Sequence, residues 1–407
     1  MKSLVYADIR KALETAISSN PTFKDWNYGA SGISALLDAL AYNDHRLGYF
    51  AKMLLDESFV DTAHSMPAML SHAKRLGYSV RGKRAAVVSL DVVVTIPDSV
   101  VFASTAISVP RGTKFRGANT IKDTRVFTVL DPQELVETDP EGTNRLFKGS
   151  VLCHEGSVKT KTFTTDGTTL NPIYDVRDAG CDSTTLQVFV APPASTQEVQ
   201  LKRAAKPEDI SDDTHVFYTA YDREGTHKLF FAQTYEAGST VRAEFLSSSG
   251  SQGNGAVKFA FAKGTAASTI DINGFTAVTA TSAAPSQGGG DAQTIEDLRV
   301  AIPLSWRRQN RAVTSEDIKG IIQSDYADLS VVNVWGGEDE TRRRYGKKMV
   351  CVVPKTTRVL SLAGRADIRR ILDVYRVPGD EIIFVDAVEQ IVDVVVAVTR
   401  SASSRSD

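Results

Sequence analysis

Cysteine is scarce in this chain of 407 residues. Its three thiols, Cys153, Cys181 and Cys351, are odd in number and far apart in the sequence. Such spacing argues against a disulfide framework and is typical of a reducing compartment. His154 follows Cys153, but no second Cys or His lies at the spacing of a zinc site. The sequence therefore predicts no metal and no cofactor.

Long apolar runs and an excess of charge of one sign are also missing. The formal net charge is -2, which gives no electrostatic case for binding nucleic acid or acidic membranes. No apolar run approaches the length that spans a bilayer. The first residues include Asp8 and no signal-peptide core, so we expect no Sec export. With 42% hydrophobic and 24% charged residues, the composition is that of a globular protein with several domains.

The sequence lacks the common catalytic motifs. It contains no G-x-S-x-G, no P-loop and no G-x-G-x-x-G that opens a helix. The run from Ser249 to Gly253 has only a superficial likeness to a nucleophile elbow and is better interpreted as a loop. With 49 acidic residues, no carboxylate pair can be singled out as a glycosidase site. We therefore expect no enzyme activity and no catalytic residues.

Residues 1–84 are predicted to form an N-terminal helical domain. The longest helix runs from Ile33 to about Leu55 and has one apolar stripe at helical spacing. Helices like these are marginal without tertiary partners, so another part of the chain or another subunit must cover the stripe. Asn43 lies near it, either solvated at its edge or setting the register between packed helices. The candidate interface residues are Ile33, Leu36, Leu37, Leu40, Asn43, Leu47 and Leu54.

The remaining chain is predicted to be β-rich and then mixed, which gives an α+β multidomain fold. Alternation of apolar and polar residues begins near Ala85 and predicts a β-rich middle domain over 85–287, which can contain an inserted subdomain. Residues 288–400 are predicted to form hinge helices and a C-terminal α+β dimerisation domain with strands at 330–335, 347–353, 381–385 and 391–398. Residues 401–407 are expected to be a disordered tail.

The stretch 288–317, here called the joint, is predicted to hold a hinge between two capped helices. The glycine run Gly288, Gly289 and Gly290 has little steric restriction and supplies the hinge. Thr294 and Thr314 are predicted N-caps, each with an aspartate three residues later. Pro303 is expected to end the first helix. The joint residues are Asp291, Thr294, Asn310, Arg311, Thr314 and Asp317.

Arg311 in the joint and one basic run leave alternatives open, whereas Asn310 has one interpretation. Asn310 is interpreted as a left-handed helix terminator. Arg311 either ties the two helix ends together with its planar guanidinium group or lies on the surface. The run Arg342, Arg343 and Arg344 is a solvated loop, a contact for an acidic protein surface, or a nucleic-acid contact for which aromatic neighbours are few.

Four stretches of the chain form an ordered set of motifs: 36–86 with Leu40-Ala41-Tyr42-Asn43, Glu57, Thr62-Ala63 and Leu76-Gly77-Tyr78; Val109–Phe115; Gly253-Asn254-Gly255-Ala256; and Gly289–Asp317. This set resembles the baseplate J-like family of contractile phage tails, and more narrowly its wedge-protein branch in T-even-like tails. The chain departs from the family where relatives often carry a Phe-Gly-Asp-Gly turn, because it has Phe230-Phe231-Ala232-Gln233 there.

The resemblance implies a structural part of the virion tail baseplate, assembled in the host cytoplasm. Such proteins form the inner ring around the central hub, link wedges, and rearrange when the sheath contracts. The implied partners are a second copy of the chain, an elongated second wedge subunit, a small sheath-initiating wedge protein, and the hub or spike proteins. It implies no nucleic acid and no membrane contact of its own.

Two other functions stay open from the sequence. One is the equivalent baseplate part of a genome-less, phage-derived injection particle. The other is a glycan-binding or glycan-degrading tail protein, which would need aromatic platforms and a carboxylate pair, whereas only 8% of the residues are aromatic.

Overall fold

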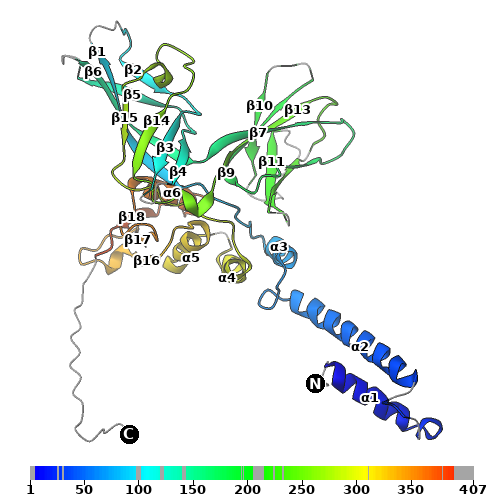
Figure 1. The fold of residues 1–407 in the computed structure, drawn as a ribbon. Helices are drawn as coiled ribbons and strands as arrows, with labels where there is room; N and C mark the ends of the chain where they lie inside the picture. The colour runs from blue at the N-terminus through cyan, green and yellow to red at the C-terminus, as the bar shows by residue number, and fades with distance from the viewer. Residues whose placement is uncertain are drawn as a thin grey trace, which may run out of the picture. The chain divides into compact units, whose positions relative to one another are not determined.

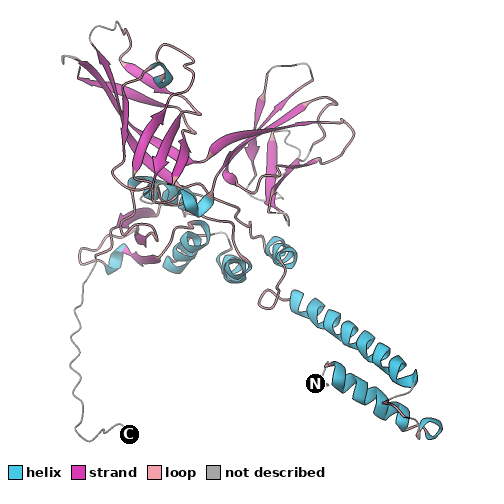
Figure 2. Cartoon of the chain, in the orientation of Figure 1, coloured by secondary structure: helices cyan, strands magenta, loops and turns pink. Residues whose placement is uncertain are grey.

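Figures 1 and 2 show the fold of the chain in a computed structural model. The chain divides into two compact units, each assembled from three segments. Unit 1 comprises Met1–Arg84, Val158–Ser247 and Asp291–Asn310; unit 2 comprises Ala85–Ser157, Ser248–Gly290 and Arg311–Asp407. The structure describes residues 5–24, 27–29, 32–97, 102–119, 123–139, 144–193, 195, 197–204, 215–222, 225–231, 233–309, 311–377 and 379–388.

In its described residues, unit 1 contains the helices α1, α2, α3 and α4. Helices α1 (Tyr6–Ser18) and α2 (Gly32–Glu57) pack on each other, with the short 3-10 helix η1 (Pro21–Phe23) between them in sequence. Helix α3 (Met66–Arg75) packs on α4 (Ile295–Arg308), which comes from the joint. Their shared core is apolar and fixes the α3–α4 pair. It consists of Ala63, Met69, Ala73, Val80, Leu298 and Ile302.

Unit 1 also contains a seven-stranded sheet with the order β7-β13-β9-β10-β11-β12-β8. Strands β10 and β11 are parallel, whereas β13 and β9, β9 and β10, β11 and β12, and β12 and β8 pair antiparallel. Alternating burial along β9 and β13 points Val188, Val241 and Phe245 into one core. The strands are β7 (Ser157–Thr164), β8 (Ile173–Asp175), β9 (Cys181–Ala191), β10 (Val199–Arg203), β11 (Val216–Tyr221), β12 (His227–Phe231) and β13 (Thr240–Ser247).

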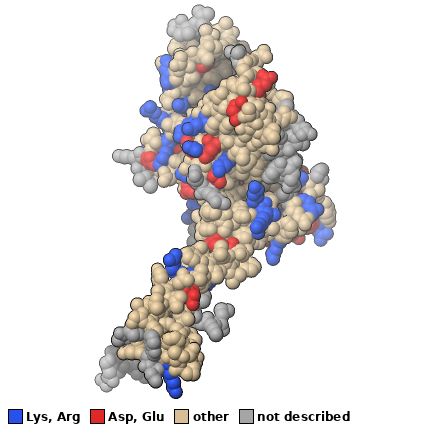
Figure 3. Space-filling view, turned by 90° about the vertical axis from the view of Figure 1, so that its right-hand side faces the viewer, with Lys and Arg blue, Asp and Glu red and all other residues tan. Residues whose placement is uncertain are grey.

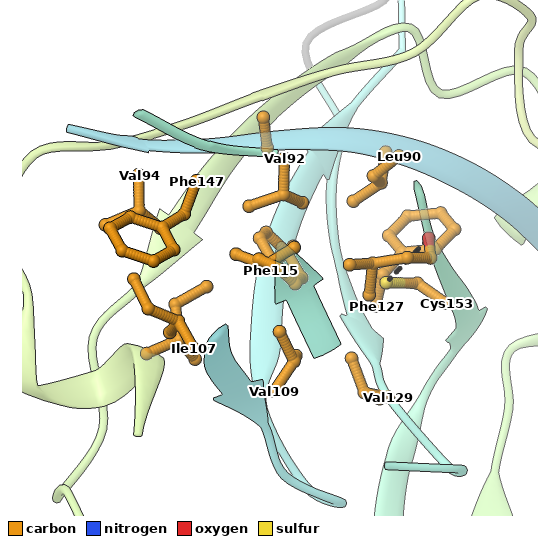
Figure 4. Close-up of a cluster of buried hydrophobic side chains, with 14 of the residues drawn as sticks. Leu90, Val92, Val94, Ile107, Val109, Phe115, Phe127, Val129, Phe147 and Cys153 are labelled. Atoms are coloured by element: carbon orange, nitrogen blue, oxygen red, sulfur yellow. Dashed lines mark hydrogen bonds between the residues drawn. The ribbon is translucent and has the colours of Figure 1, made fainter. Parts of the chain in front are cut away.

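Unit 2 is built on an eight-stranded sheet. Its main path is β14-β3-β4-β6-β1-β15, and β5 joins β6 to β2. Figure 4 shows Phe115, Phe127 and Phe147 pointing into the same interior as Leu90 and Val92, all fully buried. The strands are β1 (Val87–Pro97), β2 (Ala106–Val109), β3 (Lys114–Ala118), β4 (Thr124–Thr128), β5 (Gln133–Asp139), β6 (Asn144–Glu155), β14 (Lys258–Ala262) and β15 (Val278–Thr281), with 3-10 helices η3 (Gly250–Gly253) and η4 (Ile272–Gly274).

The C-terminal part of unit 2 is a small α+β layer. Strands β16 (Val331–Gly336) and β17 (Lys347–Val353) are antiparallel, with η5 (Gly337–Asp339) between them in sequence, and β18 (Glu381–Val385) pairs parallel to β17. Helices α5 (Ser315–Asp325) and α6 (Leu362–Asp373) contribute Ile318, Ile322, Ile368 and Leu372 to its core.

The structure confirms the predicted α+β class and corrects one local expectation. Pro303 does not end the first joint helix, because α4 continues through it to Arg308. Leu298 and Ile302 are buried before the proline, and this packing outweighs the one backbone hydrogen bond that proline cannot donate. The predicted strand at 391–398 and the tail at 401–407 lie outside the described residues. The domain boundaries at 84, 287 and 400 stay predictions.

Candidate functional site

The predicted interface helix α2 is largely uncovered by the rest of the chain. Leu37 and Ala41 are buried and Ile33 is half-buried, but Leu36, Leu40, Leu47 and Leu54 are 52–67% exposed. No described residue of α2 beyond Ala41 is buried. The surface of the N-terminal helices, at the foot of Figure 3, carries few charged side chains. Along most of its length the apolar stripe therefore has no partner among the residues that the structure describes.

The exposed stripe has the spacing of a coiled-coil seam. Its members follow one another at intervals of four and three residues, the pattern that keeps one side of a helix facing a second helix. Asn43 is exposed and occupies one seam position, in agreement with either of its predicted roles. The α2 seam consists of Leu36, Leu40, Asn43, Leu47, Phe50 and Leu54. The sequence-based list lacked Phe50, which this spacing identifies.

A polar network fixes α1 against the first half of α2. Arg10 Nε donates to Asp38 Oδ1 at 2.6 Å, and Tyr6 Oη donates to the same oxygen at 2.8 Å. Arg10 Nη2 also donates to Ser34 Oγ at 3.0 Å and to the Tyr28 carbonyl at 3.2 Å. The hydrogen bonds from Arg10 and Tyr6 lower the pKa of the Asp38 carboxyl group. These contacts lie off the α2 seam and leave it free for another chain.

Glu57 organises the turn from α2 to α3. Its carboxylate accepts hydrogen bonds from the backbone of His64 and from both the backbone and the hydroxyl of Ser65. Ser65 is in turn the N-cap of α3. The Ser65 hydroxyl, followed by the backbone of His64 and Ser65, lowers the pKa of Glu57. The carboxylate thereby holds the start of α3 beside the end of α2.

The glycine run is closely packed. Gly288 has φ of +83°, and a Cβ at Gly289 would lie 2.6 Å from the Gly250 carbonyl oxygen. The Asn254 side chain makes two hydrogen bonds to Gly289, accepting from its N–H at 2.8 Å and donating to its carbonyl at 2.9 Å. Glycine is thus needed here for close approach and backbone conformation. A hinge at Gly288–Gly290 stays a prediction, and any rotation there must break these contacts.

Buried polar side chains tie the glycine run to the C-terminal layer of unit 2. Asp328 is buried and accepts from the Gly288 N–H at 3.4 Å and from the Thr356 N–H and hydroxyl at 3.2 and 3.0 Å. Gln287 is also buried; its amide donates to the Val359 carbonyl at 3.0 Å and accepts from the Ser361 N–H at 3.0 Å. Sequence reasoning missed Asp328 and Gln287, because no local motif marks them.

The two joint helices are capped as predicted, and they belong to different units. Thr294 and Thr314 each form a capping box, with Asp297 and Asp317 respectively. Helix α4 lies in unit 1 and α5 in unit 2, and the chain passes between the units at 290/291 and again at 310/311. Asp291 and Arg311 are exposed, while Asn310 lies outside the described residues. The left-handed position at the end of α4 is Gln309, with φ of +49°.

The predicted basic run lies on the loop before β17. Arg342, Arg343 and Arg344 are exposed, and the Arg344 N–H donates to the Gly337 carbonyl at 2.8 Å. Their role as a contact for an acidic partner stays a prediction.

The described residues show no alternative chemistry at the cysteines. Cys153 and Cys181 are buried, and burial raises the pKa of both thiols, so they are inert rather than reactive. Among the residues that the structure describes, no three His, Cys, Asp or Glu side chains gather as metal ligands. No helix in the described ranges combines the length and the apolar character that a membrane span requires.

Two family models match the ends of the chain. The first, described as the helical domain of baseplate wedge protein gp6-like proteins, matches residues 5–78 and includes the α2 seam. The second, described as C-terminal domain I of baseplate structural protein gp6, matches residues 314–379. They confirm the predicted resemblance to wedge proteins. Neither is described as baseplate J-like, so that wider assignment stays a prediction.

A curated relative spans nearly the whole chain. The baseplate wedge protein gp6 of Enterobacteria phage T4 is 24% identical over 400 residues, which cover 91% of this chain and 57% of the relative. The chain thus spans little more than half the length of that protein.

Two solved structures are also similar to this chain. An anti-feeding prophage baseplate chain is 13% identical and has a TM-score of 0.28, with 94% of this chain and 70% of the other covered. A chain of the type VI secretion TssK-TssF-TssG baseplate subcomplex is 8% identical and has a TM-score of 0.36, with 87% and 96% covered. At these TM-scores the structures add no support of their own. On the sequence matches, the chain is similar to the baseplate wedge protein gp6, at both of its ends by the family models and over 91% of its length by the T4 protein.

Proposed function

We propose that this chain is a structural, non-catalytic wedge protein in the baseplate of a contractile phage tail. It forms part of the inner ring around the central hub, links wedges, and changes conformation when the sheath contracts. Assembly takes place in the host cytoplasm. The support is the similarity to gp6 at both ends of the chain together with an apolar α2 seam that the chain leaves uncovered.

The α2 seam is the observation that carries this proposal. Fully burying a leucine side chain stabilises a complex by roughly 1.5–3 kcal/mol, so four leucines left in water represent a large unused contribution. Exposed apolar patches of this kind on otherwise polar proteins mark sites of protein association. A seam with intervals of three and four residues fits another helix best. The chain is therefore completed by helices of its neighbours in the assembled wedge.

The proposed partners follow from this incompleteness and from the resemblance. Helices of the elongated second wedge subunit or of a second copy cover the α2 seam. The C-terminal layer pairs with a second copy, and the small sheath-initiating wedge protein and the hub contact the ring. The exposed Arg342–Arg344 loop offers a contact to an acidic neighbour.

The test is the substitution Leu47→Asp in cells that produce the particles, with Lys52→Asp as the matched control. Leu47 is a seam position, whereas Lys52 is an exposed residue off the seam of the same helix. We expect Leu47→Asp to leave the chain folded but absent from purified particles, and Lys52→Asp to be incorporated as the wild type. Electron microscopy and mass spectrometry of the particles measure both. Normal incorporation of Leu47→Asp would contradict the proposal.

A further inference from the structure

Strand β18 is an end strand of the three-stranded sheet in the C-terminal layer. It pairs with β17 on one side, and no strand among the described residues lies on its other side. The Glu381 N–H donates to the Gly346 carbonyl just before β17, so the backbone groups of Glu381 and Ile383 point towards β17 in this parallel ladder. Those of Ile382 and Phe384 point the other way. They form the free edge of β18.

The free edge of β18 is accessible to a further strand. Within the described ranges, the only hydrogen bond to it comes from a side chain, because Arg369 Nη2 donates to the Ile382 carbonyl at 3.2 Å. Arg369 is exposed, and its long side chain can turn aside at the cost of that bond. The carbonyl oxygen also has a second lone pair. An added strand could therefore pair here without displacing any described backbone, and such an edge is a template for pairing.

A cavity of about 370 Å³ lies along the free edge, between β18 and α6. Leu362 and Ala366 of α6 line one side of it, and both are exposed, Leu362 by 79%. The half-buried Phe384 lines the other side. Helix α6 packs on the sheet through Ile368 and Leu372, which lie in the core below the cavity walls. The walls are thus apolar and can contact the side chains of a strand added to the edge.

The predicted strand at 391–398 follows this edge closely in the sequence. It lies outside the described residues, which end at 388, and residues 386–390 separate it from β18. Apolar residues fill every second position, so a strand here would have one face made of valine only, while Asp393 would lie on the opposite face. The valine face would consist of Val392, Val394, Val396 and Val398.

We propose that residues 391–398 of the same chain pair antiparallel with the free edge of β18 and extend the sheet by one strand. The connection, 386–390, has the length of a common hairpin loop. Pairing beside β16, at the other end of the sheet, would require this connection to cross two strands. The same segment of a second copy lacks the tether, which raises the effective concentration of the attached one at the edge. This inference does not depend on the wedge function.

The apolar pattern sets the register of the proposed pairing. With this loop, Val392 lies opposite Phe384. Val394 then lies opposite Ile382, and both valines face the cavity, because directly opposed residues share one face of a sheet. Asp393 faces outwards into water. A shift by one residue would turn Asp393 into the cavity, where a carboxylate without a partner is unfavourable.

Disulfide trapping in the full-length chain tests this pairing. Ile383→Cys and Asp393→Cys would be directly opposed on the outer face as a non-hydrogen-bonded pair, where the two Cα atoms are close enough for a disulfide. Cys351→Ser is present in every variant, whereas Cys153 and Cys181 are buried and stay. Mild oxidation, electrophoresis without reductant and peptide mass spectrometry measure the product. We expect a disulfide within one chain.

The matched control is Ile383→Cys with Val394→Cys, whose side chains would point to opposite faces. It should form at least about tenfold less disulfide than the first pair. Circular dichroism checks that all variants are folded. The proposal is overturned if the first pair forms no disulfide, if its disulfide joins two chains, or if the control pair reacts equally.

Two lysine substitutions, each added to the first cysteine pair, test the register. Val394→Lys would place a charge in the apolar cavity and should reduce the disulfide by about tenfold or more. Val395→Lys would lie on the outer face opposite Glu381, and it should leave the disulfide unchanged. Equal yields from the two lysine variants would overturn the proposed register and the pairing with it.

Discussion

His227 is a buried titratable side chain between the sheet of unit 1 and the segment that follows α3. It is 2% exposed, and its ring contacts the edge of Tyr221 with centroids 5.3 Å apart. Gly82 approaches so closely that a Cβ there would lie 2.6 Å from His227 Nε2. Burial, aided by the nearby Arg203, lowers the pKa of His227 to about 4 from its usual 6.5. The folded chain therefore holds this imidazole neutral at pH 7.

We predict that His227 makes unit 1 less stable in acid. Because its folded pKa lies below its unfolded pKa, the unfolded state binds the proton more readily. Above pH 6.5 the free energy of unfolding is not reduced by His227. As the pH drops towards 4, this free energy falls by roughly 3 kcal/mol at most. Urea unfolding at pH 7.5 and pH 4.5 measures this loss. His227→Phe, which keeps a ring against Tyr221, should lose less stability between the two pH values, and an equal loss would contradict the prediction.

At Gly289 the structure predicts a packing defect rather than a change in flexibility. Gly289→Ala would place a methyl group 2.6 Å from the Gly250 carbonyl oxygen and 2.8 Å from Asn254 Oδ1. Overpacking of this kind costs about 1–3 kcal/mol. Gly32→Ala is the matched control, because a Cβ at Gly32 has no neighbour within 4 Å. Urea unfolding should show a loss for Gly289→Ala and none for Gly32→Ala.

Urea unfolding of glycine variants is also needed before a hinge at Gly288–Gly290 can be tested. Valine or proline at Gly288–Gly290 should block contraction if rotation occurs there, but the same variants would disturb Asp328 and Asn254. Loss of contraction supports a hinge only in a variant whose unfolding free energy equals that of the wild type. Contraction by particles that carry such variants would exclude the hinge.

At the scale of elements, the joint helices α4 and α5 begin with the same kind of N-terminal capping box, although they belong to different units. In each, a threonine hydroxyl accepts from the N–H of an aspartate three residues later, and the aspartate accepts from the threonine N–H. We predict that Thr294→Ala and Thr314→Ala each lower stability by about 0.5–2 kcal/mol, because the first turn loses its acceptor. Serine at either position should restore most of it. Equal stability of the alanine and serine variants in urea unfolding would contradict this.

The helix caps show which elements the sequence could predict. Thr294 and Asp297 lie three residues apart, as do Thr314 and Asp317, so each pattern is visible in the chain. The same holds for the turn after α3, where Gly77 has φ of +69°. Pro303 misled the prediction, because the packing of Leu298 and Ile302 against α3 overrides a local helix-breaking preference.

Contacts between distant segments could not be predicted in this way. Asp328 reaches Gly288 across 40 residues, and Gln287 reaches Ser361 across 74. No motif near Asp328 or Gln287 in the sequence indicates which distant residue each one contacts. The pairing of β1 with both β6 and β15 likewise joins segments far apart in the chain. The α2 seam was predictable because its spacing is local, although the absence of an intramolecular cover required the structure.

For the whole molecule, the two units imply two cooperative responses within one chain. Each unit combines three segments, so a local change should spread through segments distant in sequence but not into the other unit. Thr294 and Thr314, only 20 residues apart, lie on opposite sides of the last passage between the units. They therefore provide a matched pair of probes.

We predict that Thr294→Ala speeds amide hydrogen exchange in α4 and in α3, which packs on it, and leaves α5 and β16 unchanged. Thr314→Ala should do the reverse, because α5 packs on β16 and α6. Mass spectrometry of peptides from both variants at equal pH and temperature measures the two patterns. If either substitution speeds exchange equally in α3 and β16, the units unfold as one body. In that case the boundary between the units at 310/311 could not act as a joint at which one unit moves independently of the other.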